Sequence, residues 1–327
     1  MVYLFVDSSG FGGIESHIHQ LALMLQSQQV DVEVVFLSRY PGHPLYSQLE
    51  QASVPFRFLA DTSTIRFFRR LSSRDVVHAH GYKASILARG CRVLAAFHLV
   101  TTFHAGEAVA GKLACYEWFN RYSACLSRNL AVSRKIQQRQ PFHCELQRNF
   151  VRCGENALER KRHHRLQVGF VGRLSHEKAI DRFASLCQQL PSMDFHVFGD
   201  GEQASLLDNA PLNWHGFVSS MAPYWHQLDV LLITSRAEGM PMAALEAMAN
   251  GVVVIATDVG EMPSLLDSQW LVEEAQWPKL ADKLQHIEKR GEAYWFALSQ
   301  QQQQMVRANY SDTACWQQLS QIYQLSQ

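Results

Sequence analysis

Short runs of consecutive apolar residues alternate along the chain with segments in which apolar residues recur every three or four positions. The first pattern is typical of strands buried on both faces, and the second of helices with one apolar face. Ile14, Ile18, Leu21 and Leu25 form such a helical stripe. The alternation predicts an α/β protein with parallel sheets. Nine segments show the strand pattern: residues 2–6, 32–37, 75–80, 98–103, 128–133, 166–174, 194–200, 230–235 and 252–258.

The order of these segments predicts two doubly wound, Rossmann-like domains. The chain has 327 residues, which is long for a single core. Five predicted strands precede the basic polar segment 155–165 and four follow it, so we expect a linker there. In open parallel sheets ligands bind beyond the carboxyl ends of the strands, so the loops of both domains are expected to face one cleft. The predicted boundaries are 1–150, 151–310 and a final helical segment, 311–327.

Composition and charge narrow the classes of partner. Hydrophobic residues make up 47% of the chain and charged residues 18%, as in ordinary globular proteins. The net charge of zero hides an asymmetry, because residues 1–150 hold sixteen Lys and Arg against ten Asp and Glu. This excess is modest and no nucleic-acid reader motif accompanies it, so no nucleic-acid partner is expected.

The cysteines and the apolar runs indicate the compartment. None of the seven cysteines forms a C-x-x-C pair, which indicates a reduced cytoplasmic protein without structural zinc. The first residues lack the basic and apolar regions of a signal peptide. No apolar run reaches the roughly 18 residues that a membrane-spanning helix needs. We therefore expect a soluble protein, or one that is peripheral on the inner face of the cytoplasmic membrane.

The segment EGMPMAALEAMANG, residues 238–251, places two carboxylates around a helix start. Free N–H groups and the positive dipole end make helix N-termini anchors for hydroxyls and phosphates. Pro241 suits the first helical position, where its missing N–H costs nothing. The alternative is that Glu238 only matches the helix dipole and Glu246 is a solvated helix residue.

Two cations follow the strand at 166–174. Arg173 comes directly after it and Lys178 about one turn later, a spacing that lets an Arg fork and a Lys point charge grip a diphosphate. Solvated surface charges are the alternative. The glycine-bearing turns near Gly199 and near Phe217 and Val218 would let a nucleotide base approach the backbone.

The first strand is followed by DSSGFGGIESH, which only partly matches a dinucleotide-binding fingerprint. Gly10, Gly12 and Gly13 are present, but Glu15 stands where the last glycine is required, so the signal for NAD is weak. These glycines either allow a phosphate or sugar to approach or simply form a turn.

Histidines end two of the predicted strands. His104 follows the strand at 98–103, where an imidazole can bind a sugar hydroxyl or move a proton. His78 and His80 end the strand at 75–80. We interpret His78 as structural and leave the role of His80 open.

Seven of these elements occur in one order along nearly the whole chain, and together they resemble the GT-B glycosyltransferases of the large retaining family 4. The spacing of Glu238 and Glu246 is the most diagnostic element. The seven are GGIE (12–15), DVVHAHG (75–81), TTFHAG (101–106), GRLSHEKAID (172–181), FGDGE (198–202), HGFV (215–218) and EGMPMAALEAMANG (238–251).

The resemblance implies transfer of a sugar from a nucleotide-diphosphate sugar to a glycan or lipid-linked acceptor, with retention of configuration and without a cofactor or metal. Cell-surface polysaccharide or glycolipid synthesis would be the setting. Arg173 and Lys178 would hold the diphosphate and stabilise the departing nucleotide. Glu238, with the amides of Gly239 and Met240, would bind hydroxyls of the donor sugar, and Glu246 the ribose.

The resemblance also assigns the other domain. Gly12 and Gly13 would face the phosphate and the acceptor, and His104 the donor sugar. His80 and Glu15 are acceptor-side candidates. The last helix would cross back onto the N-terminal domain. The remaining donor-side positions are Gly199, Phe217, Val218 and Pro241.

Three positions depart from the family pattern in the loop GVVVIATDVGEMPSLL. Val253 stands for Pro, Glu261 for the second Gly and Ser264 for Glu. This loop is the one support for an alternative, a catalytically silent partner subunit that binds a donor or polymer. A nucleotide-sugar epimerase is a second alternative, which the GGIE segment and Glu238 disfavour.

Two segments of the basic half interleave aromatic and cationic residues, at 64–75 and 112–128. As amphipathic helices they would contact an anionic membrane. The alternative is that their apolar sides pack on the sheet and their arginines are solvated.

Overall fold

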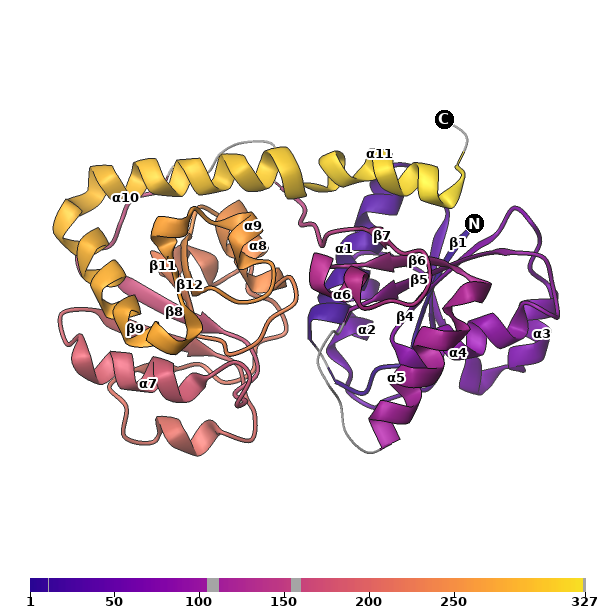
Figure 1. Ribbon diagram of the computed structural model, residues 1–327, viewed down its shortest axis with the longest axis horizontal. Helices are drawn as coiled ribbons and strands as arrows, with labels where there is room; N and C mark the ends of the chain where they lie inside the picture. The colour runs from indigo at the N-terminus through magenta and orange to yellow at the C-terminus, as the bar shows by residue number, and fades with distance from the viewer. Residues whose placement is uncertain (11, 105–111, 154–159, 326–327) are drawn as a thin grey trace. The chain divides into compact units, whose positions relative to one another are not determined.

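The computed structural model describes residues 1–10, 12–104, 112–153 and 160–325. The chain forms two compact units. The first unit consists of Met1–Phe150 with Cys315–Gln327, and the second unit is Val151–Ala314. Each unit is built around one sheet with helices packed on it (Figure 1).

The first unit has a seven-stranded sheet in the order β3-β2-β1-β4-β5-β6-β7, with all neighbouring strands parallel. The strands are β1 (Val2–Val6), β2 (Val32–Phe36), β3 (Phe56–Phe58), β4 (Val76–His80), β5 (His98–Phe103), β6 (Arg128–Ala131) and β7 (Glu145–Leu146). The helices are α1 (Gly13–Ser27), α2 (Pro44–Gln51), α3 (Thr64–Arg69), α4 (Tyr82–Cys91), α5 (Lys112–Tyr122), α6 (Arg134–Gln138) and α11 (Asp312–Tyr323).

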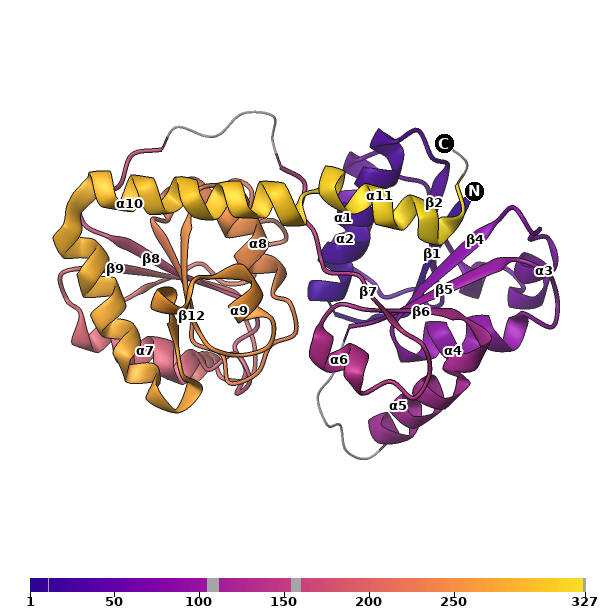
Figure 2. The ribbon, with the colours of Figure 1, turned by 45° about the horizontal axis from the view of Figure 1, so that its top comes forward.

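Helices cover both faces of this sheet because successive strand residues point to opposite sides. Leu4 of β1 belongs to a buried cluster that includes Ile18 of α1 and Leu319 of α11. The next residue, Phe5, belongs to the cluster on the other face, with Phe68 of α3. The late helix α11 therefore completes the core of the first unit (Figure 2).

The second unit has a six-stranded parallel sheet in the order β10-β9-β8-β11-β12-β13. The strands are β8 (Gln167–Val171), β9 (Asp194–Phe198), β10 (Asn213–Trp214), β11 (Val230–Ile233), β12 (Val253–Thr257) and β13 (Leu271–Val272). The helices are α7 (Ile180–Gln189), α8 (Met242–Ala249), α9 (Met262–Leu265) and α10 (Leu280–Tyr310), which is kinked at Gly291.

The two doubly wound, Rossmann-like parallel sheets confirm the predicted fold class, and all nine predicted strands are present. The predicted stripe on α1 is also confirmed, since Ile18, Leu21 and Leu25 are buried. The strands β3, β7, β10 and β13 were not predicted. They have only two or three residues each, too few to show a periodicity.

Parts of the predicted linker and of the basic aromatic segment 64–75 pack on the unit to which they belong. Of the predicted linker, residues 155–159 lie outside the described residues. Arg160 packs on the second unit and donates to the carbonyls of Leu228 and Asn250. In the segment 64–75, Phe67, Phe68 and Leu71 are buried against the first sheet, which agrees with the packing alternative for these three residues, while Ile65 is exposed.

No helix in the described ranges combines the length and the apolar character that crossing a membrane requires.

Candidate functional site

The sheet of the second unit reverses its strand order between β8 and β11. The strands β9 and β10 lie on one side of this point, and β12 and β13 on the other. The loops that leave neighbouring strands here run in opposite directions, which opens a crevice at the carboxyl edge. Residues 172–179 follow β8 and residues 234–241 follow β11. Together these loops carry Arg173, Lys178, Glu238, Gly239, Met240 and Pro241.

An ion pair joins the two loops. The Lys178 ammonium donates to both carboxylate oxygens of Glu238, at 2.6 and 2.7 Å. The Ser235 hydroxyl donates to Glu238 Oε1 at 2.7 Å. The Glu238 side chain is 7% exposed and that of Lys178 32%, so the carboxylate is inside and the ammonium reaches the surface. The residues predicted to bind the diphosphate and the sugar of a donor thus lie in direct contact.

Further hydrogen bonds fix this pair. The Thr234 hydroxyl lies 3.2 and 3.0 Å from the carbonyls of Lys178 and Ala179. Arg236 donates to both carboxylate oxygens of Asp181, at 2.8 and 2.6 Å, and its backbone N–H donates to the Glu177 carbonyl. Bidentate Arg–carboxylate bonds fix orientation as well as distance. The loops after β8 and β11 are therefore held as one structure.

Arg173 is the exposed cation of the site. Within the described part of the chain its guanidinium has no hydrogen bond or ion pair. By contrast, Arg236 and Arg182 nearby are both engaged with carboxylates. Arg173 is thus available to an anionic ligand without breaking an existing contact.

Glycines let the loops approach each other. A Cβ on Gly199, at φ 147°, would lie 1.9 Å from the Gly172 carbonyl oxygen, so no larger residue fits. The Trp214 indole donates to the Gly199 carbonyl at 2.9 Å. Of the other predicted base-side positions, Phe217 is 50% exposed and Val218 packs against the core.

The loop after β12 packs against the backbone of Glu238 and Gly239. A Cβ on Gly260, at φ 60°, would lie 2.3 Å from the Glu238 carbonyl oxygen and 2.5 Å from that of Gly239. The backbone N–H of Glu261 donates to the Gly239 carbonyl at 2.9 Å. This loop departs from the family pattern at Glu261, yet the hydrogen bond from Glu261 to Gly239 uses the backbone.

The helix α8 begins one residue later than predicted. Pro241 has ψ 119° and is the N-cap, and Met242 is the first helical residue. The fixed φ of proline suits either position, so the sequence did not distinguish them. Glu246 is the fifth residue of α8. It is half-buried, its carboxylate has no hydrogen-bond partner among the described residues, and burial raises its pKa to about 7.

In the first unit, Gly12 is the N-cap of α1, and its N–H donates to Glu15 Oε2 at 2.7 Å. Glu15 is buried, and its other oxygen, Oε1, has no partner among the described residues. No described atom comes within 4 Å of a Cβ built on Gly13, so packing does not require glycine there. The structure therefore gives Glu15 a helix-capping contact and leaves space beside Gly13.

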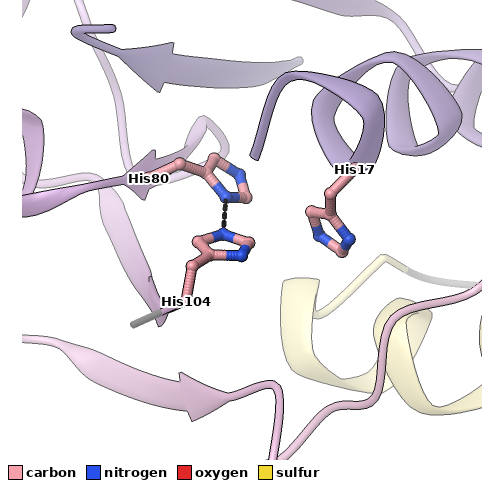
Figure 3. Close-up of side chains that lie close together, drawn as sticks. All are labelled: His17, His80 and His104. Atoms are coloured by element: carbon pink, nitrogen blue, oxygen red, sulfur yellow. Dashed lines mark hydrogen bonds between the residues drawn. The ribbon is translucent and has the colours of Figure 1, made fainter. Parts of the chain in front are cut away.

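Four histidines gather at the carboxyl ends of β4 and β5. His78 bonds to the Tyr323 hydroxyl at 2.7 Å and to the Thr102 hydroxyl at 2.6 Å, as expected for a structural residue. His80 Nδ1 lies 2.9 Å from His104 Nε2, and the ring of His17 from α1 lies beside both (Figure 3). Burial lowers the pKa of His17 to about 4 and holds those of His78, His80 and His104 well below the usual value.

The structure thus brings Lys178 and Glu238 into contact in the second unit, and His80 and His104 in the first. Sequence reasoning missed His17, Ser235 and Arg236. Ser235 and Arg236 stand next to the predicted motif. The partner of Ser235 is Glu238, three residues later, and the partner of Arg236 is Asp181, 55 residues earlier in the chain. His17 is buried at the border of the predicted α1 stripe, and the stripe alone does not show that it meets His80 and His104.

Two family models match the chain. Residues 165–289 match the model described as "Glycosyl transferases group 1", and residues 11–148 match "Glycosyltransferase Family 4".

Curated relatives agree with these models. The O-antigen biosynthesis glycosyltransferase WbnH of Escherichia coli is 29% identical over 42% of this chain. The putative teichuronic acid biosynthesis glycosyltransferase TuaC of Bacillus subtilis is 29% identical over 70%, and one component of the human phosphatidylinositol N-acetylglucosaminyltransferase is 23% identical over 80%. The matches with WbnH, TuaC and the human protein cover 40%, 63% and 62% of the lengths of these relatives, respectively.

Solved structures share the fold. The Anabaena protein HepE in complex with UDP-glucose has a TM-score of 0.80 at 16% identity, with 98% of each chain covered. TarM from S. aureus, in a complex that contains UDP, has a TM-score of 0.82 at 10% identity, with 98% of this chain and 99% of TarM covered. The motifs, the two parallel sheets and the family models lead to one conclusion: the chain belongs to the GT-B glycosyltransferases of group 1, family 4.

Proposed function

We propose that the protein is a retaining, metal-independent glycosyltransferase that moves a sugar from a nucleotide-diphosphate sugar to a glycan or lipid-linked acceptor. The observation that carries the proposal is the Lys178–Glu238 pair beside the exposed Arg173, at the point where the sheet of the second unit reverses. This is where a doubly wound sheet binds ligands.

The cations of this site suit a diphosphate leaving group. When the bond between the anomeric carbon and the diphosphate oxygen breaks, negative charge develops on the diphosphate. The planar guanidinium of Arg173 offers a fork of donors to two phosphate oxygens. Lys178 directs donors at Glu238 and has three N–H bonds in all, so one remains for a phosphate. Donors fixed before the reaction stabilise developing charge most effectively.

The carboxylates suit the two sugars of the donor. A carboxylate has about four acceptor positions, and Glu238 uses three of them for Lys178 and Ser235. The remaining capacity fits a hydroxyl of the transferred sugar, next to the amides of Gly239 and Met240. Glu246, whose carboxylate is half-buried without a partner among the described residues, would accept from the ribose hydroxyls. A perturbed carboxyl without a structural partner is typical of functional sites.

Relatives suggest which substrates to test. The complexes of HepE and TarM contain UDP-glucose and UDP, respectively, which supports a UDP-sugar donor. The names of WbnH and TuaC refer to O-antigen and teichuronic acid, which supports an acceptor in cell-surface polymer synthesis. The roles of Gly12, Gly13, Glu15, His80 and His104 toward donor and acceptor stay predictions, as do those of Gly199, Phe217, Val218 and Pro241.

The helix α5 supports a peripheral contact with an anionic membrane. Its inner side is held by the buried Arg89, which donates to the backbone carbonyl and the side-chain oxygen of Asn120 at 2.5 and 2.8 Å. Its outer side presents Trp118, Phe119 and Tyr122, each more than half exposed. Aromatic side chains on a basic domain suit the headgroup region of an anionic bilayer.

Removal of Arg173 should weaken nucleotide binding. We expect one nucleoside diphosphate among UDP, GDP, ADP and CDP to bind, measured by calorimetry, and Arg173→Ala to lose about tenfold or more in affinity, since a charge-assisted hydrogen bond contributes about 1.5–3 kcal/mol. Arg290→Ala, an exposed arginine on α10, should bind as the wild type does. Equal affinity in both variants would contradict the assignment, and binding without turnover of the matching nucleotide sugar would favour a silent partner subunit.

Gly260→Ala should displace the Glu238 segment. A methyl group would lie 2.3 Å from the Glu238 carbonyl oxygen, so we expect nucleotide-sugar turnover to fall at least about tenfold, because small displacements of positioning groups have large effects on rate. Gly42→Ala is the matched control, since Gly42 has φ 70° and no described atom within 4 Å of its added Cβ. Both variants place alanine at a positive φ, which destabilises the fold. Only Gly260→Ala also brings a methyl group against backbone atoms of the site, so only this variant should lose activity. Wild-type turnover in folded Gly260→Ala would refute this.

The stability of the protein should depend on the ionisation of Glu246. Below pH 4.5 the carboxyl is protonated in both the folded and the unfolded state. Between pH 4.5 and about 7 the unfolded chain releases the proton while the folded protein keeps it, so the free energy of unfolding falls as pH rises. The free energy of unfolding of Glu246→Gln, relative to wild type, should therefore rise by up to about 3 kcal/mol across this window.

Urea denaturation at pH 4.5, 6 and 8 measures this difference. Glu292→Gln, an exposed glutamate on α10, is the control and should show little pH dependence relative to wild type. If the difference in free energy of unfolding between Glu246→Gln and wild type stays constant with pH, then the conclusion that burial raises the pKa of Glu246 is wrong.

Membrane contact through α5 should depend on its outer aromatic residues. We expect the protein to sediment with phosphatidylglycerol vesicles and not with phosphatidylcholine vesicles, and the double variant Trp118→Ala/Phe119→Ala to lose several-fold in bound fraction. Phe296→Ala is the control, because Phe296 is an exposed aromatic residue of the second unit. An unchanged bound fraction in the double variant would rule out this surface.

A further inference from the structure

The backbone on either side of Arg173 decides where its guanidinium can reach, because the side chain has no hydrogen bond or ion pair in the described ranges. The Gly172 N–H donates to the Phe198 carbonyl, and the Leu174 N–H donates to the Asp200 carbonyl, both at 3.0 Å. Arg173 therefore stands between two residues that are held by the end of β9 and by the loop that follows it.

The loop after β9, residues 199–203, packs closely against this backbone. A Cβ on Gly201 would lie 2.5 Å from the Leu174 carbonyl oxygen, and one on Gly199 would lie 1.9 Å from the Gly172 carbonyl oxygen. Close-packed segments transmit displacements to each other. A shift of the loop after β9 would therefore move the cation that follows β8.

Trp214 connects this loop to the edge of the sheet. Its indole N–H donates to the Gly199 carbonyl at 2.9 Å, which ties the last residue of β10 to the turn after β9. The Gly199 N–H donates to the Gly216 carbonyl at 2.8 Å. Both backbone polar groups of Gly199 are thus bonded to residues at or beyond the end of β10.

The exposure of Trp214 indicates that its hydrogen bond matters more than its burial. The residue is 44% exposed and lies on a strand of two residues at the edge of the sheet. The apolar contribution of a side chain scales with the area that it removes from water, so Trp214 gains only part of it.

Trp295 is the opposite case. It is fully buried, and its indole N–H donates at 2.9 Å to the carbonyl of Asp229, the residue before β11, at the amino edge of the same sheet. The same kind of hydrogen bond thus belongs to the core at Trp295 and reaches the candidate donor site at Trp214.

We propose that Trp214 is a positioning residue of the donor site, which fixes the loop after β9 and, through it, the reach of Arg173 toward a diphosphate. The inference rests on the proposed function, since it takes a nucleoside diphosphate as the ligand of Arg173. A contact between a guanidinium fork and phosphate oxygens depends on distance and orientation. A backbone that is already held therefore binds more tightly than one that must be ordered on binding.

The Lys178–Glu238 pair should not depend on this hydrogen bond. Thr234 and Arg236, from the loop after β11, hold the part of the β8 loop that carries Lys178. Loss of the Trp214 hydrogen bond should therefore reduce nucleotide affinity through Arg173.

A double-mutant cycle on nucleotide affinity tests the proposal. UDP, GDP, ADP and CDP are titrated into the whole chain by calorimetry, and the cycle uses the one that binds the wild type. Trp214→Phe keeps an aromatic ring and removes the N–H donor, so affinity should fall about two- to tenfold, the effect of one neutral hydrogen bond. In the Arg173→Ala background the same substitution should have no further effect, because the two residues act through one contact. A tryptophan that only stabilised the fold would weaken binding equally in both backgrounds.

Trp295→Phe is the matched control, because it removes the same type of hydrogen bond at the amino edge of the sheet. It should lower the midpoint of urea denaturation and leave the nucleotide affinity at the wild-type value.

Hydrogen exchange in the wild-type protein tests the same bond without a variant that has to fold. Coupling free energies are reciprocal, so if the Trp214 hydrogen bond favours binding, bound nucleotide must stabilise that bond. In protein with isotope-labelled tryptophan, exchange of the Trp214 indole hydrogen should slow several-fold when nucleotide is added.

Three results would overturn this proposal and leave the proposed function intact. They are equal nucleotide affinity of Trp214→Phe and wild type, an equal loss of affinity in both backgrounds, and an indole exchange rate that nucleotide does not change. If none of these nucleotides binds the wild type, the proposed function fails, and the role of Trp214 fails with it.

Discussion

The hydrogen-bonded connection between the loops after β8 and β11 is the constraint on which the candidate donor site depends. The strands β8 and β11 are neighbours at the point where the strand order reverses, so the loops that follow them begin side by side and then diverge. Proximity alone would leave Lys178 and Glu238 free to move. The bonds of Thr234 to the Lys178 and Ala179 carbonyls, and of Arg236 to Asp181, fix the backbone on either side of the pair. Hydrogen bonds within the protein thus hold the pair in place.

The close approach of three loops explains why glycine stands where it does. Gly199 leaves room for the Gly172 carbonyl, and Gly260 for the carbonyls of Glu238 and Gly239. These contacts involve backbone atoms, which have no rotamers with which to escape a larger side chain. A loop can therefore change its other residues, as it has at Glu261, while this one glycine is kept.

The sequence was informative about the sheets and about the positions of the charged motifs. Apolar runs located the nine central strands because those strands are buried on both faces. The short edge strands β3 and β10 were missed, since two or three half-exposed residues carry no pattern. The predicted strands correctly placed Lys178 and Glu238 in loops at the carboxyl edge of one sheet. Their mutual ion pair was not predicted, because it depends on side-chain direction, which motif spacing does not contain.

The histidines show the same limit more sharply. His78 and His80 stand two residues apart near the end of the same predicted strand, and only the three-dimensional structure shows that their partners differ. Tyr323, which satisfies His78, is 245 residues away along the chain. His17 borders the apolar stripe of α1, which was predicted correctly, but the stripe does not show which side chains from other elements a residue at its border contacts.

The discontinuity of the first unit has a consequence for how the chain folds during synthesis. The second unit is one continuous stretch, so all its strands can pair as soon as residue 314 has left the ribosome. The first unit is made earlier but lacks Leu319, Ile322 and Tyr323 from its core until the last helix emerges. During that interval His78 has no Tyr323 hydroxyl, and the apolar face beneath α11 is open to solvent. The half of the protein that is translated first is therefore the half that finishes folding last.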